Sequence, residues 1–419
     1  MSSIYYYGQD GLVATDDLVK KFNLGPKEIK YSHKSGSYYF DFVGFIFHDN
    51  CILTVFPKHY LQESTLNTLN ATHTEIHRDI KLLFDVIQHY QEKEKSNASA
   101  KAYIGSLAGY DSDYPFKAFF EVYSYFQKYG LYKETENKVV AGTRGKIAWK
   151  STIAKSSKII SEGNLIFSPF YVYKKNYNSV FLTECMAFII DHTIEAFHDF
   201  ISMQKTGIKT NFDFIRNIDY VLAQLRVNLN IAFKDVNRKL ILSMIEFFEQ
   251  YGCRSSGGDY HIEIRYFDMI WQKMMQSYLN KHFIGIDMVT GYANFDTNAT
   301  KGIVEFENRR FGDIDDSSHK FYIDVDHLAF DNGYLYLFDS KYYSNVDNLN
   351  YKQLAYIEIL RYHYHGMKEM YNILFLPGNK KDEQHFCYSS KYVGPRTMGT
   401  SIKEQYLETK QLMEDYLKH

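Results

Sequence analysis

An aspartate and a lysine stand two residues apart near the end of the apolar stretch YLYLFDSKYY, residues 334 to 343. On a β-strand, positions i and i+2 point to the same face, so Asp339 and Lys341 project side by side while Phe338 and Ser340 face the other way. A carboxylate and an ammonium in a core-like strand cost free energy when they are buried without partners. The two side chains could form a simple ion pair or half of an active site.

A preceding apolar stretch predicts the partner strand of a hairpin. Asn332-Gly333 between the two stretches is a strong hairpin signal, because a type I′ turn needs positive φ at both central residues. With these two residues as the loop, Asp326 lies opposite Asp339, with their Cβ atoms about 4.5 to 5.5 Å apart. Opposed carboxylates repel unless a cation lies between them or one of them is protonated. We therefore expect the turn to bring two acidic groups together.

The same register places Asp324 opposite Lys341 on the face that carries both carboxylates. Carboxylate oxygens with retained waters are the ligands that Mg²⁺ prefers. A lysine beside such a site can position or deprotonate a water and stabilise charge on a phosphate. A surface hairpin with its charges in solvent is the alternative. The apolar side chains around the charges favour the site, since they predict a buried hairpin: Phe321, Ile323, Val325, Leu335, Leu337 and Phe338.

The remaining patterns predict three consecutive regions in an α/β (overall α+β) protein. Residues 1–178 read as a mixed α/β region, 179–257 as a helical middle, and 258–419 as an α/β region that contains the hairpin. The expected helices span 73–93, 115–129, 182–201, 212–251, 260–281 and 347–364, with a polar helix at the C-terminal end. The expected strands lie within 38–57, 302–311, 320–330, 334–343 and 371–377.

Composition indicates an ordinary soluble protein, with 45% hydrophobic and 23% charged residues. The net charge of −2 means that contact with nucleic acid must come from local patches. The chain shows no signal peptide and no apolar run long enough to span a membrane, so we expect a cytoplasmic protein without a membrane partner. The widely spaced cysteines fit a reducing compartment and argue against a structural zinc site: Cys51, Cys185, Cys253 and Cys387.

Three further motifs are weaker. Residues 138–158 hold six basic side chains and no acidic one, which suits DNA phosphates, an acidic partner or a solvated strand. The GTRGK segment within it lacks the spacing of a Walker A loop, so the sequence shows no recognisable NTPase site. His73 and His77 stand at i and i+4, but a glutamate placed as in HExxH and a third ligand are missing, which disfavours zinc.

Asp326 and, thirteen positions later, Asp339-Ser-Lys341 resemble the PD-(D/E)xK nuclease signature, with Val325 replacing its usual proline. FDSKYY is similar to the DAKYY element of the McrC and LlaJI-type restriction endonuclease subunits. Two other stretches resemble the same group in the right order. They are VGFIFHDNCILTVFPKHY (43–60), a strand pair ending in Pro-Lys, and GTRGKIAWKSTI (142–153).

This resemblance implies a C-terminal PD-(D/E)xK nuclease core and a Mg²⁺-dependent DNA endonuclease, the cleavage subunit of a type II- or IV-like restriction system in phage defence. It makes Asp326, Asp339 and Lys341 the catalytic residues, with the two aspartates as the metal ligands and Lys341 as the residue that activates water. Double-stranded DNA and an McrB-like AAA+ NTPase are the partners that it implies. A stand-alone repair or transposition nuclease, and a non-catalytic DNA-binding subunit, remain as alternatives.

The sequence departs from the family pattern on the helix before the hairpin. Trp271-Gln272 stands where family members often carry Trp-Glu, which weakens a second metal position. Asp268, one turn earlier, could replace the missing carboxylate. After the hairpin, Gln353 and Tyr356 resemble the Gln and Tyr of related nucleases, and their helical spacing fits core packing equally well.

Overall fold

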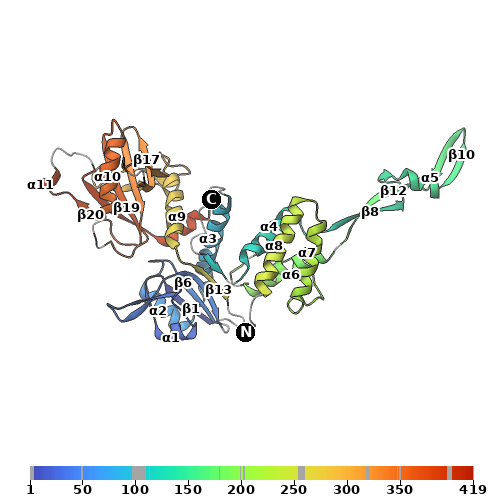
Figure 1. Ribbon diagram of the computed structural model, residues 1–419, viewed down its shortest axis with the longest axis horizontal. Coiled ribbons are helices and arrows are strands. Elements are labelled where there is room, and N and C mark those ends of the chain that lie inside the picture. Colours follow the sequence, from blue (N-terminus) through green and yellow to red (C-terminus); the bar gives the residue numbers. More distant parts are fainter. Residues whose placement is uncertain are drawn as a thin grey trace. The chain divides into compact units, whose positions relative to one another are not determined.

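The computed structural model describes residues 4–48, 51–96, 110–112, 114–178, 180–198, 200–201, 203–252, 260–317, 320–346, 348, 351–393 and 399–418. The chain forms two compact units, one built from Met1–Asp113 with Gly258–His419 and the other from Tyr114–Gly257 (Figure 1). The expected boundary at 257/258 coincides with a unit boundary. The expected boundary at 178/179 lies inside the second unit, and the two ends of the chain form one unit instead of two regions.

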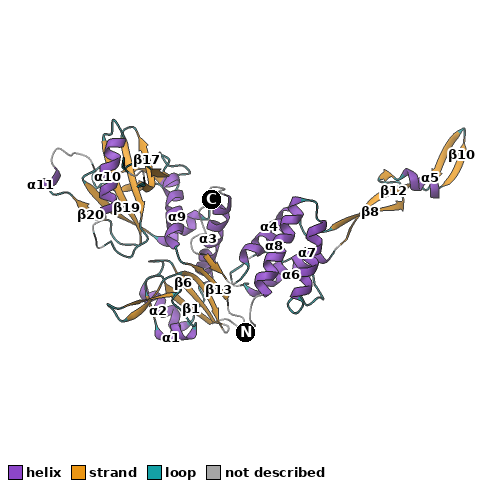
Figure 2. Cartoon of the chain, in the orientation of Figure 1, coloured by secondary structure: helices purple, strands orange, loops and turns teal. Residues whose placement is uncertain are grey.

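The fold is a mixed α/β architecture, as expected (Figure 2). The described helices are α1 (Asp16–Lys21), α2 (Glu63–Thr72), α3 (His77–Ser96), α4 (Phe116–Tyr129), α5 (Trp149–Lys155), α6 (Phe181–Ala196), α7 (Ile218–Ile231), α8 (Asp235–Gly252), α9 (Phe267–His282), α10 (Tyr351–His363), α11 (Ser390–Val393) and α12 (Thr409–Tyr416). None of these helices is long and apolar enough to cross a bilayer.

The strands of the first unit come from both ends of the chain. From the N-terminal side they are β1 (Ile4–Gln9), β2 (Val13–Ala14), β3 (Ile29–Ser32), β4 (Ser37–Phe40), β5 (Val43–His48), β6 (Cys51–Phe56) and β7 (Tyr110–Ser112). From the C-terminal side they are β13 (Tyr260–Ile264), β14 (Phe283–Ile286), β15 (Ala293–Phe295), β16 (Glu307–Phe311), β17 (Ile323–Asp331), β18 (Tyr334–Ser340), β19 (Glu369–Pro377), β20 (Glu383–Cys387) and β21 (Ser401–Leu407).

A five-stranded sheet joins the two ends of the chain, in the order β1-β6-β5-β13-β7. β5 and β6 form the hairpin expected within 38–57. β13 pairs with β5 on one side and with β7 on the other. The helix expected over 260–281 is therefore wrong for its first residues, 260–264, and correct from Phe267 onward. Neighbouring strands offered backbone hydrogen bonds that the local sequence pattern does not reveal.

A six-stranded sheet in the C-terminal part carries the predicted hairpin, in the order β16-β17-β18-β19-β21-β20. β18 and β19 are parallel, and α10 makes the connection between them. Apolar side chains of α10, including Ile357 and Leu360, pack with Leu335 and Leu337 of β18 in one buried cluster. Phe338 contributes to a separate group of aromatic rings with Phe306 and Phe375. Successive residues of β18 thus enter different parts of the core, as a strand requires.

The second unit combines a helical part with small sheets. Its helices α4, α6, α7 and α8 contact one another through buried apolar faces. α4, α6, α7 and α8 correspond to the helices expected at 115–129, 182–201 and 212–251, although α7 and α8 divide the last range. The strands are β8 (Glu134–Ala141), β9 (Lys146–Ile147), β10 (Ser157–Ser161), β11 (Asn164–Ser168) and β12 (Tyr171–Asn178). β8, β12 and β9 form one sheet, and β10 and β11 form a two-stranded hairpin.

Candidate active site

The hairpin has the turn and register that the sequence predicts. Asn332 and Gly333 have φ angles of 50° and 89°, the left-handed values of a type I′ turn. Asp331 pairs with Tyr334, and the pairing continues to His327 with Phe338. Glycine is suited to position 333 because a Cβ there would also lie 3.0 Å from the Lys368 side chain.

Beyond His327 the strand departs from the predicted register. The pairing of β17 with β16 shifts between Leu328, opposite Glu307, and Val325, opposite Arg309. Three steps along β17 therefore oppose two along β16, which is the geometry of a β-bulge. Bulges next to active sites re-aim side chains, and Asp326 lies within this one.

The prediction that Asp324 faces Lys341 is wrong. Asp324 instead accepts two hydrogen bonds from the Arg310 guanidinium, at 2.7 and 2.8 Å. Arg310 also stacks over the ring of Tyr322, with 4.1 Å to the ring centroid. Phe321 was expected in the core, and its side chain is 65% exposed. The acidic group therefore contains Asp326 and Asp339 without Asp324.

Asp326, Asp339 and Lys341 come together at the end of β18. Asp339 is 1% exposed, and its Oδ2 lies 2.5 Å from the Lys341 ammonium. The backbone N–H of Ser340 donates a hydrogen bond of 3.2 Å to Asp326 Oδ2. Lys341 is held by its own backbone N–H, which donates to Phe375 O on β19 at 2.9 Å. Backbone hydrogen bonds thus hold the Asp326 carboxylate and the main chain of Lys341 in place.

The electrostatics of the Asp326 and Asp339 carboxylates suit a bound cation. Burial, followed by the nearby Asp339 carboxylate, raises the pKa of Asp326 from 3.8 to about 7, against the opposing effects of Lys341 and the Ser340 N–H. Apart from the Lys341 ammonium beside Oδ2, the buried carboxylate of Asp339 has no hydrogen-bond donor in the described part of the chain. Buried acceptors of this kind, one of them beside a second carboxylate, fit a hard divalent cation such as Mg²⁺.

The raised pKa of Asp326 predicts a defined pH dependence of stability. The folded protein binds this proton more tightly than the unfolded chain, so the contribution is complete below the ordinary value of 3.8 and is lost as the pH rises through about 7. In EDTA, we expect the melting temperature of the wild type to fall from pH 5 to pH 8 more steeply than that of Asp326→Asn.

Millimolar Mg²⁺ should reverse this loss at pH 8, because a cation bound to the folded state relieves the repulsion. The effect should be much smaller at pH 5, where Asp326 is protonated, and should largely disappear in Asp326→Asn. Thermal unfolding of both proteins at pH 5 and at pH 8, each with and without Mg²⁺, measures these effects. An equal Mg²⁺ effect on both proteins would place the cation elsewhere.

A buried histidine that the sequence did not single out supports the site from the other face. His327 is fully buried, and burial lowers its pKa to about 3, so its ring is neutral. Its Nδ1 donates to Gln276 Oε1 of α9 at 2.6 Å, because the amide nitrogen of Gln276 donates to Phe306 O. Nε2 is then the acceptor for Ser340 Oγ, also at 2.6 Å. These hydrogen bonds link Gln276 of α9 to Ser340, the residue between Asp339 and Lys341.

Ser340→Ala tests whether the histidine network is structural. The variant leaves His327 Nε2 as a buried acceptor without its donor, which should lower the free energy of unfolding by about 1–3 kcal/mol. DNA cleavage should persist at low temperature, since the backbone N–H to Asp326 remains. Denaturant titration and a cleavage assay measure the two effects, with Ser390→Ala, which changes an exposed serine of α11, as the control. Loss of cleavage in a fully folded Ser340→Ala protein would give the hydroxyl a direct role.

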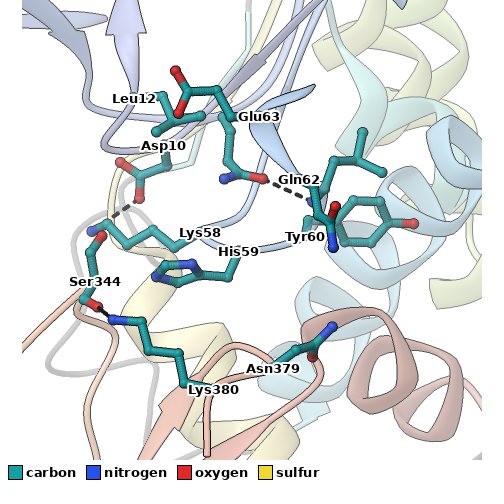
Figure 3. Close-up of a pocket in the computed structure, with 12 residues that line it drawn as sticks. Asp10, Leu12, Lys58, His59, Tyr60, Gln62, Glu63, Ser344, Asn379 and Lys380 are labelled. Carbon is teal, nitrogen blue, oxygen red and sulfur yellow. Dashed lines mark hydrogen bonds and ion pairs between the residues drawn. The ribbon is translucent and has the colours of Figure 1, made fainter. Parts of the chain in front are cut away.

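The Pro-Lys motif near residue 58 contacts the segment that follows Lys341. The Lys58 backbone N–H donates to Tyr342 Oη at 2.8 Å, and its ammonium donates to Tyr342 O at 3.4 Å and pairs with Asp10 at 3.4 Å. Lys58 and His59 line a pocket of about 410 Å³ together with Ser344 and Lys380 (Figure 3). Burial, then the charges of Lys380 and Lys58, lower the pKa of His59. Two lysines and a histidine, together with Asp10 and Glu63, therefore line a pocket beside the segment that follows Lys341.

Of the other residues singled out by the sequence, Gln353, Tyr356 and Trp271 are buried and Asp268 is exposed. Gln353 and Tyr356 are buried, and Tyr356 Oη donates to Asp324 O at 2.7 Å, so the tyrosine holds β17 against α10. Trp271 is fully buried, and its Nε1 donates to Phe375 O. Asp268 is exposed on α9. Its charge contributes to the raised pKa of Tyr342, after burial and Asp10.

The residues of the weaker motifs lie apart from the hairpin in sequence and have their own surroundings. His73 Nδ1 lies 3.0 Å from Tyr5 O, while His77 Nδ1 lies 3.3 Å from a Glu75 carboxylate oxygen, so the two imidazoles have separate partners. The basic side chains described in the run 138–158 are all exposed, and Gly145 lies in the turn before β9, not before a helix. Cys51, Cys185 and Cys387 are free, and Cys253 lies outside the described residues.

Comparison with known proteins gives one family. The family model described as "LlaJI restriction endonuclease" matches residues 42–391. No curated protein matches. Among solved structures, a chain of the Thermococcus gammatolerans assembly of McrB AAA+ hexamers with bound McrC is 11% identical, with a TM-score of 0.34 over 100% of this chain and 99% of that one. A chain of the McrBC complex from the same organism is 12% identical, with a TM-score of 0.21 over 65% and 88%.

Proposed function

Because the chain belongs to the LlaJI restriction endonuclease family, we propose that it is the DNA-cleaving subunit of a restriction system and that Asp326, Asp339 and Lys341 form its catalytic site. The observation that carries this proposal is the buried carboxylate pair with a lysine 2.5 Å from one of its oxygens. Two carboxylates held close together at a strand end lower the stability of the fold. Their use as ligands of a bound cation in a nuclease site would account for that cost. The PD-(D/E)xK resemblance of the same residues supports this assignment.

In this proposal Asp326 and Asp339 would hold Mg²⁺, and the bound ion would supply positive charge to the phosphate oxygens. Lys341 positions and activates the attacking water, and its ammonium stabilises the developing charge. The water oxygen bonds to phosphorus as the bond to the 3′ oxygen breaks, so the products carry a 5′ phosphate and a 3′ hydroxyl. Ser340 holds Asp326 in position through its backbone N–H.

The substrate is double-stranded DNA, and its backbone would follow the basic side chains of the pocket beside the site. Lys58, His59 and Lys380 present positive or protonatable groups there, and Lys58 contacts Tyr342 directly after the catalytic lysine. Cationic groups at this place would bind phosphates on either side of the scissile one. The low net charge of the chain makes such local contacts necessary.

The second unit offers a docking surface for a partner, which we propose is an McrB-like NTPase. The β10–β11 hairpin carries the cross-strand pairs Ile159–Ile166 and Ile160–Leu165. All four side chains are between 45% and 79% exposed. Adjacent pairs point to opposite faces of the hairpin, so both faces are apolar and exposed. Exposed apolar surface of this kind marks a protein–protein contact, and the exposed lysines beside it suit an acidic rim on the partner.

A plasmid cleavage assay tests the proposed function. Purified chain, with and without an McrB-like NTPase and nucleotide, is incubated with methylated and unmethylated plasmid in Mg²⁺ or in EDTA. We expect site-specific cleavage that needs Mg²⁺, the partner and nucleotide, and no nucleotide hydrolysis by the chain alone. Efficient site-specific cleavage without partner or nucleotide would indicate a self-sufficient endonuclease. Absence of cleavage under every condition, with intact folding, would favour a non-catalytic subunit.

A further inference from the structure

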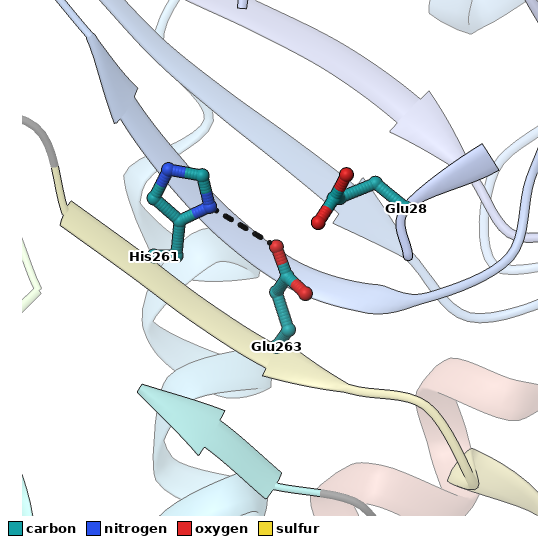
Figure 4. Close-up of side chains that lie close together, drawn as sticks. All are labelled: Glu28, His261 and Glu263. Carbon is teal, nitrogen blue, oxygen red and sulfur yellow. Dashed lines mark hydrogen bonds and ion pairs between the residues drawn. The ribbon is translucent and has the colours of Figure 1, made fainter. Parts of the chain in front are cut away.

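A second group of potential metal ligands lies in the N-terminal sheet, on elements other than the hairpin. Glu28, His261 and Glu263 each offer one ligand atom, and these atoms lie within 4.8 Å of one another. His261 and Glu263 are alternate residues of β13 and therefore point to the same face. Glu28 immediately precedes β3, and Figure 4 shows its carboxylate turned toward the other two side chains.

The charges of this group do not balance. Glu263 is 2% exposed and Glu28 is 8% exposed. His261 Nδ1 lies 3.2 Å from Glu263 Oε1, so a protonated imidazole would neutralise one carboxylate. The Glu28 carboxylate accepts a hydrogen bond from the Gly25 backbone N–H at 2.5 Å, which adds no full charge. Buried carboxylates without full compensation are costly, and a divalent cation among them would remove that cost.

The backbone around β13 positions His261 and Glu263 independently of contacts among the three side chains. On β5, the residue opposite Glu263 is Gly44, which contributes no side chain beside the carboxylate. Glycine is required there, because its φ is +147° and a Cβ would lie 1.9 Å from Ile262 O. The neighbouring pair, His261 with Ile46, places the imidazole beside a buried apolar cluster. His261 and Glu263 are thus fixed by a strand in the middle of a sheet, which favours pre-organisation of two of the three ligands.

We propose that Glu28, His261 and Glu263 bind a divalent transition-metal ion of the Zn²⁺ class. Imidazole and carboxylate together suit Zn²⁺, whereas Mg²⁺ and Ca²⁺ prefer oxygen ligands throughout. Bond lengths of about 2.0–2.2 Å in a tetrahedral site put neighbouring ligand atoms roughly 3.3–3.5 Å apart. The separation of 3.2 Å between His261 Nδ1 and Glu263 Oε1 is close to that value. Three protein ligands leave the fourth position to water.

Such an ion would connect the two ends of the chain. Glu28 belongs to the N-terminal segment, whereas β13 is the first described strand after the second unit in sequence. Bound metal would therefore stabilise the five-stranded sheet at the place where the chain re-enters the first unit. The proposed role is structural, and the ion takes no part in DNA cleavage.

The test uses the full chain carrying Asp326→Asn and Asp339→Asn, so that the proposed nuclease site binds no metal. Zinc content after gel filtration and calorimetric Zn²⁺ titration should show one ion per chain. Co²⁺ should give the visible absorption of a four-coordinate site, and Zn²⁺ should raise the melting temperature. Adding Glu263→Gln or Glu28→Gln should remove the stoichiometric zinc and the Co²⁺ spectrum. Glu28 lies in a loop, so its variant keeps the test valid if Glu263→Gln does not fold.

Glu75→Gln is the matched control, because Glu75 and His77 form an exposed pair at 3.3 Å that no further ligand among the described residues extends to a group of three. This variant should retain the zinc. Absence of stoichiometric Zn²⁺ binding, or binding unchanged by Glu28→Gln and Glu263→Gln, would overturn the proposal and leave a His–Glu ion pair. Either result is independent of the nuclease assignment, since the protein tested lacks both nuclease carboxylates and DNA cleavage is not the measurement.

Discussion

Lys341→Ala is expected to reduce DNA cleavage by on the order of 10²–10³-fold or more, the loss typical of removing one group that stabilises transition-state charge. The ammonium lies 2.5 Å from Asp339 and its side chain is 15% exposed, so it is next to the carboxylates and still accessible to a substrate. Asp326→Asn and Asp339→Asn should abolish cleavage as well, because each removes a proposed ligand of Mg²⁺. Cleavage rates with partner, nucleotide and Mg²⁺ provide the measurement.

The control for this prediction is Lys368→Ala. Lys368 is an exposed lysine whose ammonium lies 5.8 Å from the centroid of the Tyr334 ring, at the opposite end of β18. It should cleave DNA as the wild type does. All variants should keep the wild-type circular dichroism spectrum, and Asp326→Asn should be more stable than the wild type in EDTA at pH 8. A folded Lys341→Ala protein that cleaves DNA at the wild-type rate would remove the lysine from the catalytic site.

Ile160→Asp combined with Leu165→Asp should eliminate partner-dependent cleavage. These side chains are 79% and 55% exposed and face each other across the β10–β11 hairpin. Two carboxylates in an apolar contact would have to be desolvated on binding, which costs several kcal/mol. Because the side chains are exposed in the free chain, its folding should be unaffected. Co-purification with the NTPase and the rate of partner-stimulated cleavage measure the effect.

Leu242→Asp is the matched control for the hairpin. Leu242 belongs to α8 of the same unit and is 51% exposed, so it tests the effect of an added charge on another apolar surface position. This variant should bind the NTPase and cleave DNA as the wild type does. Mg²⁺-dependent stabilisation should remain in the hairpin variant, which separates docking from the metal site. Normal partner binding by the hairpin variant would place the docking surface elsewhere.

Features set by neighbouring residues could be predicted from the sequence alone. The type I′ turn needs positive φ at two adjacent positions, and Asn332-Gly333 supplies it, so the first five pairs of the hairpin follow by counting. The alternation of a strand likewise predicts that Asp339 and Lys341 share a face. α4 and α6 appear where apolar residues recur with the period of a helix. The family resemblance also rests on short motifs whose residues are close in sequence.

Only the tertiary structure decided the features that depend on partners distant in sequence. Residues 260–264 form a strand because β5 and β7 pair with them on both sides. The bulge in β17 depends on β16, and it moved Asp324 to Arg310 while it kept Asp326 near Asp339. Periodicity describes one segment at a time, whereas hydrogen bonds across a sheet and the burial of charge are settled between segments. For the same reason, the contacts of His327 with Gln276 and of Lys58 with Tyr342 were invisible in the sequence.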